Sequence, residues 1–224
     1  MGREDRLAFL RTFLPGLVML IVVYLMLTAF RDYRDNYGID LFRELGQAGT
    51  AAVFTRSEVP VGIGVMVCVA ALTWIRDNRN GLIAAFVLMI TGLLTLAGST
   101  WLLREGAIGP IAWMVATGFG SYLAYVPYNS VLFDRMIGYT RVTSTAVFTI
   151  YLADATGYTG SVLIQLYKDL FQTQTTRLEF FLEFAVLLGL GGALLLFAGL
   201  IYFLWRGPVG RAAGPAVGTR SPGA

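Results

Sequence analysis

The sequence predicts an all-α membrane protein, a six-transmembrane-helix bundle, and two observations carry that prediction. Hydrophobic residues make up 56% of the 224 positions and charged residues only 14%, whereas a soluble domain carries about 25% charged residues. Six apolar runs are also long enough to cross a bilayer as helices, which takes roughly 20 residues each. The runs are too long and too continuous for the alternating strands of a membrane barrel, so helices remain.

The predicted transmembrane domain covers residues 1–206. Its helices are expected at about 12–30, 59–75, 80–103, 106–133, 142–167 and 184–205. The first run is longer than the core of a cleaved signal peptide, and no small-residue cleavage site follows it, so we expect it to stay as an anchor. Residues 207–224 are rich in Gly, Pro, Ala and Arg and predict a disordered cytoplasmic tail.

The longest predicted link runs from Arg31 to Glu58 and opens with the charged stretch RDYRDN. The apolar residues of IDLFRELG, inside this link, predict a short amphipathic helix that lies at the membrane interface. Ser57 is expected to cap the second transmembrane helix, with Pro60 in its first turn.

The distribution of Lys and Arg over the links predicts the orientation. Ten fall on the side of the two termini: Arg3, Arg6, Arg11, Arg76, Arg79, Arg135, Arg141, Arg206, Arg211 and Arg220. Seven fall on the other side: Arg31, Arg34, Arg43, Arg56, Arg104, Lys168 and Arg177. Five acidic residues from Asp32 to Glu58 offset the first four of these seven. We therefore expect both termini to lie in the cytoplasm.

Composition also narrows the function classes. The chain has no His, which is the commonest metal ligand and general base, and its single cysteine, Cys68, precludes a disulfide within the chain. A net charge of +3 is too small and too scattered for a nucleic-acid binder. A Ser–His pair is impossible, and an intramembrane aspartyl protease would need two deep carboxylates where only Asp154 lies deep. We therefore expect neither an enzyme nor a cofactor or metal site.

The fifth predicted helix carries a carboxylate near its middle. Tyr151, Asp154, Tyr158, Ser161 and Gln165 follow one another at spacings of three and four, so they share one helix face. An ionised carboxylate at that depth costs several kcal/mol unless it is paired, hydrated or protonated. Two interpretations stay open: Asp154 is a protonation or ligand site, or it is a neutral acid whose interhelical hydrogen bond fixes assembly.

The fourth predicted helix contains SYLAYVPYNS, in which Tyr122, Tyr125 and Asn129 share one face. Pro127 interrupts the backbone hydrogen bonds, and the carbonyls that it frees need other partners. This face predicts the polar wall of a substrate path opposite Asp154. The alternative is a proline kink whose tyrosine hydroxyls bond inside the bundle.

Charges at the helix ends allow two readings. Asp134 and Arg135 end the fourth helix, and Asp77 and Arg79 lie in the tight link before the third. Each pair is expected either to anchor the helix end through an interfacial ion pair or to act as a gate that changes partners between states. In the sixth helix, by contrast, the small residues Ala185, Gly189 and Ala193 predict close helix packing.

Several stretches resemble a known transporter superfamily. LTAFRDYRDN, SEVPV, GSYLAYVPYNSVLFDR and YLADATGYTGSV make residues 5–206 similar to an uncharacterised bacterial family distantly related to the major facilitator superfamily, and to the carboxy-terminal six-helix half of that superfamily. In that superfamily the first, second, fourth and fifth helices of a half line the cavity. The polar faces of the fourth and fifth helices fit this arrangement, whereas the second helix has no obvious polar face. WIRDNRNG departs from the superfamily's signature loop in its spacing and lacks the final basic residue.

The resemblance implies half of a transporter that moves an unknown small molecule by alternating access, with a second half supplied by a homodimer or a separate subunit. Asp154 would then bind a proton or cation, and Tyr122, Tyr125, Asn129, Tyr151 and Tyr158 would shape the substrate site. The alternative is a non-transporting scaffold or assembly subunit in which Asp154 is a structural hydrogen bond.

Overall fold

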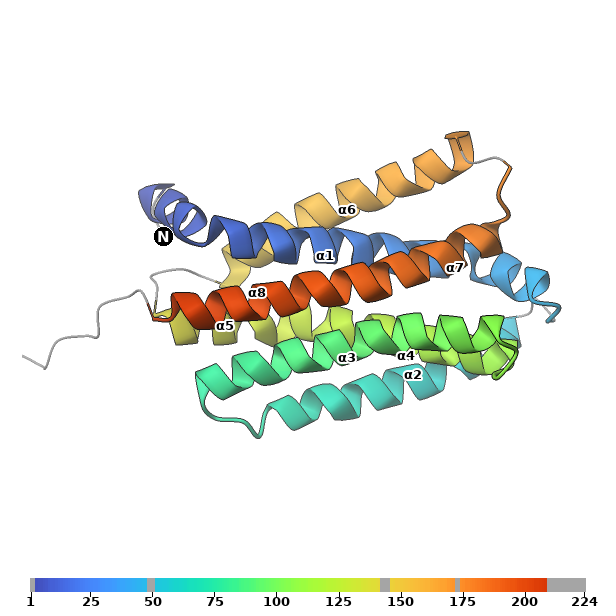
Figure 1. Cartoon of the computed structure of the whole chain (residues 1–224), viewed down its shortest axis with the longest axis horizontal. Helices are drawn as coiled ribbons and strands as arrows, with labels where there is room; N and C mark the ends of the chain where they lie inside the picture. Colours follow the sequence, from blue (N-terminus) through green and yellow to red (C-terminus); the bar gives the residue numbers. More distant parts are fainter. Residues whose placement is uncertain (1–2, 48–50, 142–145, 172–173, 209–224) are drawn as a thin grey trace, which may run out of the picture.

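A computed structural model describes residues 3–47, 51–141, 146–171 and 174–208, which form six long helical segments in an elongated bundle (Figure 1). The first three are α1 (Arg3–Glu44), α2 (Ala51–Leu72) and α3 (Asn78–Arg104). The fourth joins α4 (Pro110–Pro127), a π-helical turn η1 (Tyr128–Leu132) and α5 (Phe133–Thr140). The fifth is α6 (Ala146–Phe171), and the sixth joins α7 (Arg177–Leu187), a second π turn η2 (Leu188–Gly192) and α8 (Ala193–Arg206).

Five of these segments are long and apolar enough to cross a membrane: those built on α1, α2, α3, α6 and α7 with α8. The segment that begins with α4 falls outside this set because tyrosine, serine, glycine and proline dilute its hydropathy. The described residues therefore indicate a multi-pass integral membrane protein.

The first helix is longer than the sequence predicted. α1 is unbroken over 42 residues, so the predicted link beginning at Arg31 and the interfacial helix within it are both wrong. The charged stretch stays helical because it lies against other helices, and Tyr33, Arg34 and Phe42 are each at most 1% exposed. At 1.5 Å per residue α1 is about 60 Å long, roughly twice the thickness of the hydrocarbon core.

Other helix boundaries also differ from the prediction. α2 begins at Ala51, so the buried Ser57 is not its N-cap, and Pro60 lies in the helix interior. α4 begins at Pro110 rather than at 106, because Gly106, with φ of 70°, ends the preceding turn. α7 begins well before residue 184, since Thr176 and Glu179 form a reciprocal capping box. α6, described over Ala146–Phe171, extends past the predicted end at 167, and its predicted start at 142 falls in residues 142–145, outside the described part of the chain.

α2 and α6 form the two edges of the bundle, with α1, α3, α4 and α8 between them (Figure 1). α6 packs mainly against α1, and α2 packs mainly against α4. In the most apolar stretch of each helix, 22% of α2 and 28% of α6 is buried, against 50–56% for α1, α3 and the α7–α8 segment. These two edges are therefore the least enclosed faces of the bundle.

The described chain ends lie at one end of the bundle, together with the turn between α2 and α3 (Figure 1). The opposite end holds the connections from α1 to α2, α3 to α4 and α6 to α7. This alternation is what an even number of spanning segments requires. The tail predicted to be disordered lies almost entirely outside the described residues, which end at Pro208.

Glycines set the closest helix contacts. A Cβ built on Gly92 of α3 would lie 2.5 Å from the carbonyl oxygen of Gly120 of α4, and the reverse distance is also 2.5 Å. A Cβ on Gly189 would lie 2.6 Å from the Ala97 Cβ. The packing role predicted for the small-residue stripe of the sixth helix is therefore confirmed, with α3 as its partner.

We expect Gly92→Ala to destabilise the protein by about 1–3 kcal/mol, because the new methyl group collides with a backbone oxygen that cannot rotate away. Gly98→Ala is the matched control: it lies on the same helix, and its Cβ meets nothing within 4 Å. The free energy of unfolding in mixed micelles checks both variants. Equal stability of the two variants would contradict the α3–α4 contact.

Candidate functional site

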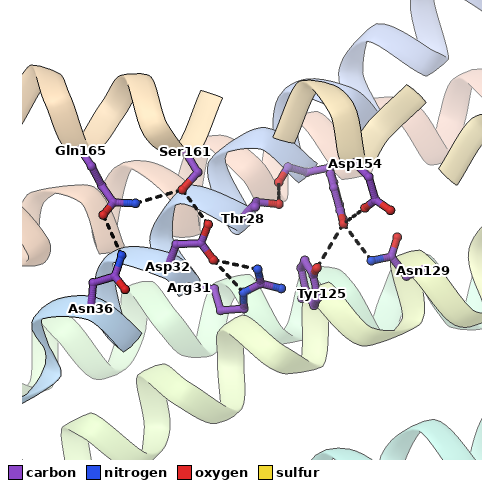
Figure 2. A network of polar contacts seen from close by, with 10 residues as sticks. Thr28, Arg31, Asp32, Asn36, Tyr125, Asn129, Asp154, Ser161 and Gln165 are labelled. Carbon is purple, nitrogen blue, oxygen red and sulfur yellow. Dashed lines mark hydrogen bonds and ion pairs between the residues drawn. The ribbon is translucent and has the colours of Figure 1, made fainter. Parts of the chain in front are cut away.

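A polar cluster joins three helical segments around the hydroxyl of Tyr24, a fully buried residue of α1. This hydroxyl bonds the Asp154 carboxylate of α6 through a short contact. It also accepts a hydrogen bond of 2.9 Å from Asn129 Nδ2, in η1, and lies 3.1 Å from the Tyr125 hydroxyl of α4. Because a hydroxyl has one proton and two lone pairs, Tyr24 donates to Asp154 and accepts from the other two residues (Figure 2).

Local backbone features bring these side chains together. Pro127 has no N–H to donate, and the helix widens into a π turn directly after it, which changes the direction in which Asn129 projects. The neighbouring Tyr128 stacks on the Tyr24 ring with a centroid distance of 4.5 Å. On α6, a Cβ at Gly157 would lie 2.9 Å from both Thr28 Oγ1 and Tyr24 Cε1, so a glycine is needed for α6 to approach α1 this closely.

A cation lies next to this cluster. The Arg31 guanidinium sits 4.4 Å from the centroid of the Tyr125 ring and pairs with Asp32 at 2.7 Å. Tyr158 of α6 is close enough to interact with the same guanidinium. Cation–π contact and pairing together offset the desolvation of Arg31. The Arg31 and Asp32 charges that α1 places beside α4 and α6 therefore neutralise each other.

The polar contacts continue along the seam between α1 and α6 (Figure 2). Ser161 Oγ donates to Asp32 Oδ2 at 2.7 Å, and Gln165 Nε2 donates to Ser161 Oγ at 3.1 Å. Asn36 Nδ2 in turn donates to Gln165 Oε1 at 2.8 Å. The Ser161 and Gln165 face of α6 therefore packs on the charged stretch of α1.

The seam ends in a polar collar at the bundle end that carries the α6–α7 connection. Tyr37 donates to Asp169 Oδ2 at 2.9 Å, and Arg177 pairs with Asp40. The Glu44 carboxylate accepts the backbone N–H of Leu178 at 2.9 Å, which satisfies a donor in the first turn of α7. One row of polar side chains thus reaches from the collar toward Asp154.

A second buried contact joins α1 to α2. The Arg34 side chain is 1% exposed and donates through Nη2 to Glu58 Oε1 at 2.6 Å and to the Met114 carbonyl at 3.0 Å. A Cβ on Gly118 would lie 2.6 Å from the same Nη2, so that glycine makes room for the guanidinium. Glu58 and Tyr122 also border an otherwise apolar groove of about 500 Å³ between α2 and α4.

The predicted site residues divide into two groups. Asp154, Tyr125 and Asn129 meet at Tyr24, whereas Tyr122 lines the groove beside α2. Tyr151 and Tyr158, which share a helix face with Asp154 in the sequence, are 69% and 50% exposed. α6 has a close neighbour on only one side, so both rings remain largely uncovered, and their part in a substrate site stays a prediction.

The predicted ion pairs at the helix ends are not present. In the described part of the chain, Asp134, Arg135, Asp77 and Arg79 form no ion pair with one another. Arg135 instead donates to the carbonyls of Ile75 and Arg76 at 2.7 and 3.3 Å, and so ties the end of the fourth segment to the α2–α3 turn. Asp77 caps α3 by accepting the Asn80 N–H at 2.8 Å.

Sequence reasoning missed the contribution of α1. Tyr24, Thr28, Asp32 and Asn36 follow one another at four-residue spacing, which places them on one helix face. Treating the charged stretch as a link hid this pattern. No comparable signal in the sequence pointed to the pairing of Arg34 with Glu58.

The match to known proteins is at family level. The model of a family of unknown function, DUF5690, matches residues 1–206, nearly the whole chain. The chain belongs to this family. No curated protein and no solved structure matches the chain, and no match links this DUF5690 member to the major facilitator superfamily. Among the described residues of this family member, no three Cys, Asp or Glu side chains are grouped to hold a metal ion.

We expect Glu58→Ala to cost about 3–5 kcal/mol, because it leaves the buried Arg34 guanidinium without its carboxylate. Arg43→Ala is the control, since Arg43 is 65% exposed in its pair with Asp40 and such a pair contributes about 0–1 kcal/mol. Unfolding free energies of both variants in mixed micelles test the difference. A Glu58→Ala loss as small as the control's would show that this pair is dispensable.

We expect Tyr24→Phe to destabilise the protein by about 1–3 kcal/mol, because the half-buried Asp154 and Asn129 groups lose a shared partner. Tyr151→Phe removes the same hydroxyl from an exposed ring on α6 and should change stability by less than about 0.5 kcal/mol. Thermal unfolding in detergent compares the two. A destabilisation by Tyr151→Phe that matches that of Tyr24→Phe would contradict the proposed cluster.

Proposed function

We propose that this chain is one half of a membrane transporter that moves a small molecule by alternating access. One observation carries the proposal: a single carboxylate, Asp154, is bonded to the hydroxyl through which α1, α4 with η1, and α6 meet. A carboxylate inside a membrane bundle is costly unless it is paired, hydrated or protonated, and such residues mark ion or substrate pathways in many membrane proteins. Binding or loss of a cation at Asp154 would change a contact shared by three segments.

The polar seam supports access from one end. Polar side chains extend from Asp154 toward the α6–α7 end of the bundle through Arg31, Asp32 and Asn36. Toward the end that carries the termini, the neighbouring residues are apolar and fully enclosed, including Leu20, Val23, Leu132 and Phe133, each at most 2% exposed. A binding group with a polar seam on one side and mainly apolar packing on the other is compatible with alternating access.

The two open edges support a second half. α2 and α6 are the least buried spanning helices, and α6 presents Tyr151 and Tyr158 from its uncovered side. In the major facilitator superfamily, which the sequence resembles, the second and fifth helices of a half line the cavity between halves. We therefore propose a second half, either another copy of the chain or a separate subunit, facing α2 and α6.

The bundle also supports a proposed orientation. Arg31 and Arg34 lie inside α1, where Arg31 packs on the Tyr125 ring and Arg34 bonds Glu58 of α2, so they no longer count as link residues on the side opposite the termini. This raises the excess of basic residues at the end that holds the termini. We propose that both termini face the cytoplasm of a bacterial inner membrane. The hydrogen bonds from Arg135 to the α2–α3 turn would then lie on the cytoplasmic side, and breaking them would be a step in gating.

A second candidate is a scaffold or assembly subunit without transport. It is favoured by the saturation of the Tyr24 hydroxyl, which already has three partners and is fully buried. In that case Asp154 would be a structural hydrogen bond that holds α6 on α1. Under both candidates we propose that the cluster binds or supports rather than catalyses; among the described residues, Asp154 is the one carboxylate bonded to the Tyr24 hydroxyl.

Cysteine accessibility separates the two candidates. With Cys68→Ser as background, single substitutions Tyr125→Cys, Asn129→Cys, Asp154→Cys and Tyr158→Cys are treated with a membrane-impermeant thiol reagent in sealed membranes. A transporter half should label at Asn129 and Asp154 from at least one side, because water reaches a transport site in some state. We expect labelling from the side of the α6–α7 connection.

Two residues at the ends of α3 control for sidedness. Asn78 is its first residue and Glu105 follows its last, and both are exposed; the two ends of α3 lie at opposite ends of the bundle (Figure 1). Asn78→Cys and Glu105→Cys should label from opposite sides, with Asn78 on the cytoplasmic side. If both controls label while Asn129 and Asp154 stay unreactive from either side, the scaffold is the better account.

A further inference from the structure

An apolar groove of about 440 Å³ lies between α3 and the sixth segment, where α7 passes into η2. Its apolar lining includes Leu94, Gly98 and Trp101 of α3 and Val186 and Leu190 of the sixth segment. Ala97 lines it where the two segments come close, since a Cβ on Gly189 would lie 2.6 Å from the Ala97 Cβ. A Cβ on Gly98 would meet nothing within 4 Å, so this glycine keeps the groove open.

The groove opens near the membrane boundary. α3 has 27 residues, which makes it about 40 Å long, against about 30 Å for the hydrocarbon core. Its last turn therefore reaches the headgroup region, where exposed tryptophans are enriched, and Trp101 is 62% exposed. Water is absent from the hydrocarbon core, and neither α2 nor α6, where a second half is proposed, borders this groove. An acyl chain of the bilayer is therefore its natural occupant.

Two opposite charges lie at the mouth of the groove. Arg104 borders it and ends α3, and Glu105 follows as the C-cap residue. Glu105 is seven residues after Gly98, or two helical turns, so it lies beyond the mouth on the same face. Both side chains are exposed, and among the described residues neither forms an ion pair. Arg34 and Arg177, toward the same end of the bundle, are both paired.

This order of charges complements a zwitterionic headgroup. A guanidinium binds phosphate oxygens well, and a carboxylate binds an ammonium group. Arg104 is the deeper of the two residues, and in such a lipid the phosphate is likewise nearer the acyl chains than the ammonium group. An anionic headgroup would meet Arg104 but would be repelled by Glu105.

Two other apolar grooves lack this arrangement. The groove between α2 and α4 has Glu58 in its lining, and a groove of about 350 Å³ between α6 and α7 has Glu183. Neither lining includes a basic residue that could bind a phosphate.

We propose that the groove between α3 and the sixth segment binds a phospholipid whose zwitterionic headgroup carries a primary ammonium group. One acyl chain lies in the groove beside Gly98, the phosphate meets Arg104, and the ammonium group meets Glu105. The bound lipid bridges α3 and the sixth segment. This site goes beyond the proposed transport function, since it uses none of the residues around Tyr24 and requires only that the chain spans a membrane.

Brominated lipids test the proposal, because bromine in an acyl chain quenches the fluorescence of a tryptophan that the lipid touches. The full chain with Trp74→Phe and Trp205→Phe keeps Trp101 as its exposed tryptophan, since Trp113 is fully buried. This parent chain is placed in phosphatidylcholine vesicles that contain brominated phosphatidylethanolamine, phosphatidylcholine or phosphatidylglycerol at one mole fraction. We expect phosphatidylethanolamine to quench most, with an affinity about two- to fivefold above the others, the range for one exposed charge pair.

Substitutions at the mouth test the headgroup assignment. Glu105→Gln leaves Arg104 alone, so the preference should pass to the anionic phosphatidylglycerol. Arg104→Gln should abolish the preference for phosphatidylethanolamine. Both residues are exposed, so the fold should persist, and the helical content by circular dichroism checks this.

A glycine pair tests the groove. Gly98→Leu should fill it and abolish the lipid preference. Gly62→Leu is the matched control, because Gly62 lines the α2–α4 groove and its Cβ also meets nothing within 4 Å; it should leave the preference unchanged.

Three outcomes would overturn the proposal. Equal quenching by the three lipids, or none by any of them, would show that Trp101 borders no selective lipid site. Stronger quenching by phosphatidylglycerol in the parent chain would contradict the zwitterionic headgroup. A preference for phosphatidylethanolamine that survives Gly98→Leu would place the lipid outside the groove.

Discussion

The hydroxyl of Tyr24 is the point on which the arrangement of α1, α4 and α6 depends. It bonds Asp154, Asn129 and Tyr125, which come from three other parts of the chain. Its ring stacks on Tyr125 and Tyr128, with centroid distances of 5.4 and 4.5 Å. α6 has close partners on only one side, so its position relies on this hydroxyl and on the seam that continues from it. A change of charge at Asp154 therefore acts on the contact on which the position of α6 depends.

The charged stretch of α1 is also stabilised by pairing, in this case between arginines and carboxylates. Arg31 and Arg34 remain within a helix because each meets a carboxylate at 2.7 and 2.6 Å. Removing such charges from water is expensive, and a paired, hydrogen-bonded arrangement is what makes their burial tolerable. The two pairs reach different neighbours: Asp32 connects onward to α6 through Ser161, and Glu58 belongs to α2. α1 is thus bonded to the helices at both open edges, although α2 packs mainly against α4.

Small residues determine where the helices approach most closely. Gly92 and Gly120 let α3 and α4 meet at their backbones, and Gly157 lets α6 reach Tyr24. The π turn after Pro127 then sets the direction of Asn129. These features explain why a polar cluster forms at one level of the bundle rather than being spread along it.

The sequence by itself determined that the chain is helical, membrane-embedded and built from six segments, because long apolar runs with few charges have no other stable arrangement in lipid. It also identified Asp154, Tyr125 and Asn129, since a deep carboxylate and a proline-interrupted polar face are visible as local patterns. Only the tertiary structure decided that α1 continues through RDYRDN, that Arg34 pairs with Glu58, and that Tyr151 and Tyr158 point outward. The physical reason is that a charge is costly inside a bundle unless it is paired and enclosed, and the groups that pair Arg34 and enclose this stretch lie on other helices.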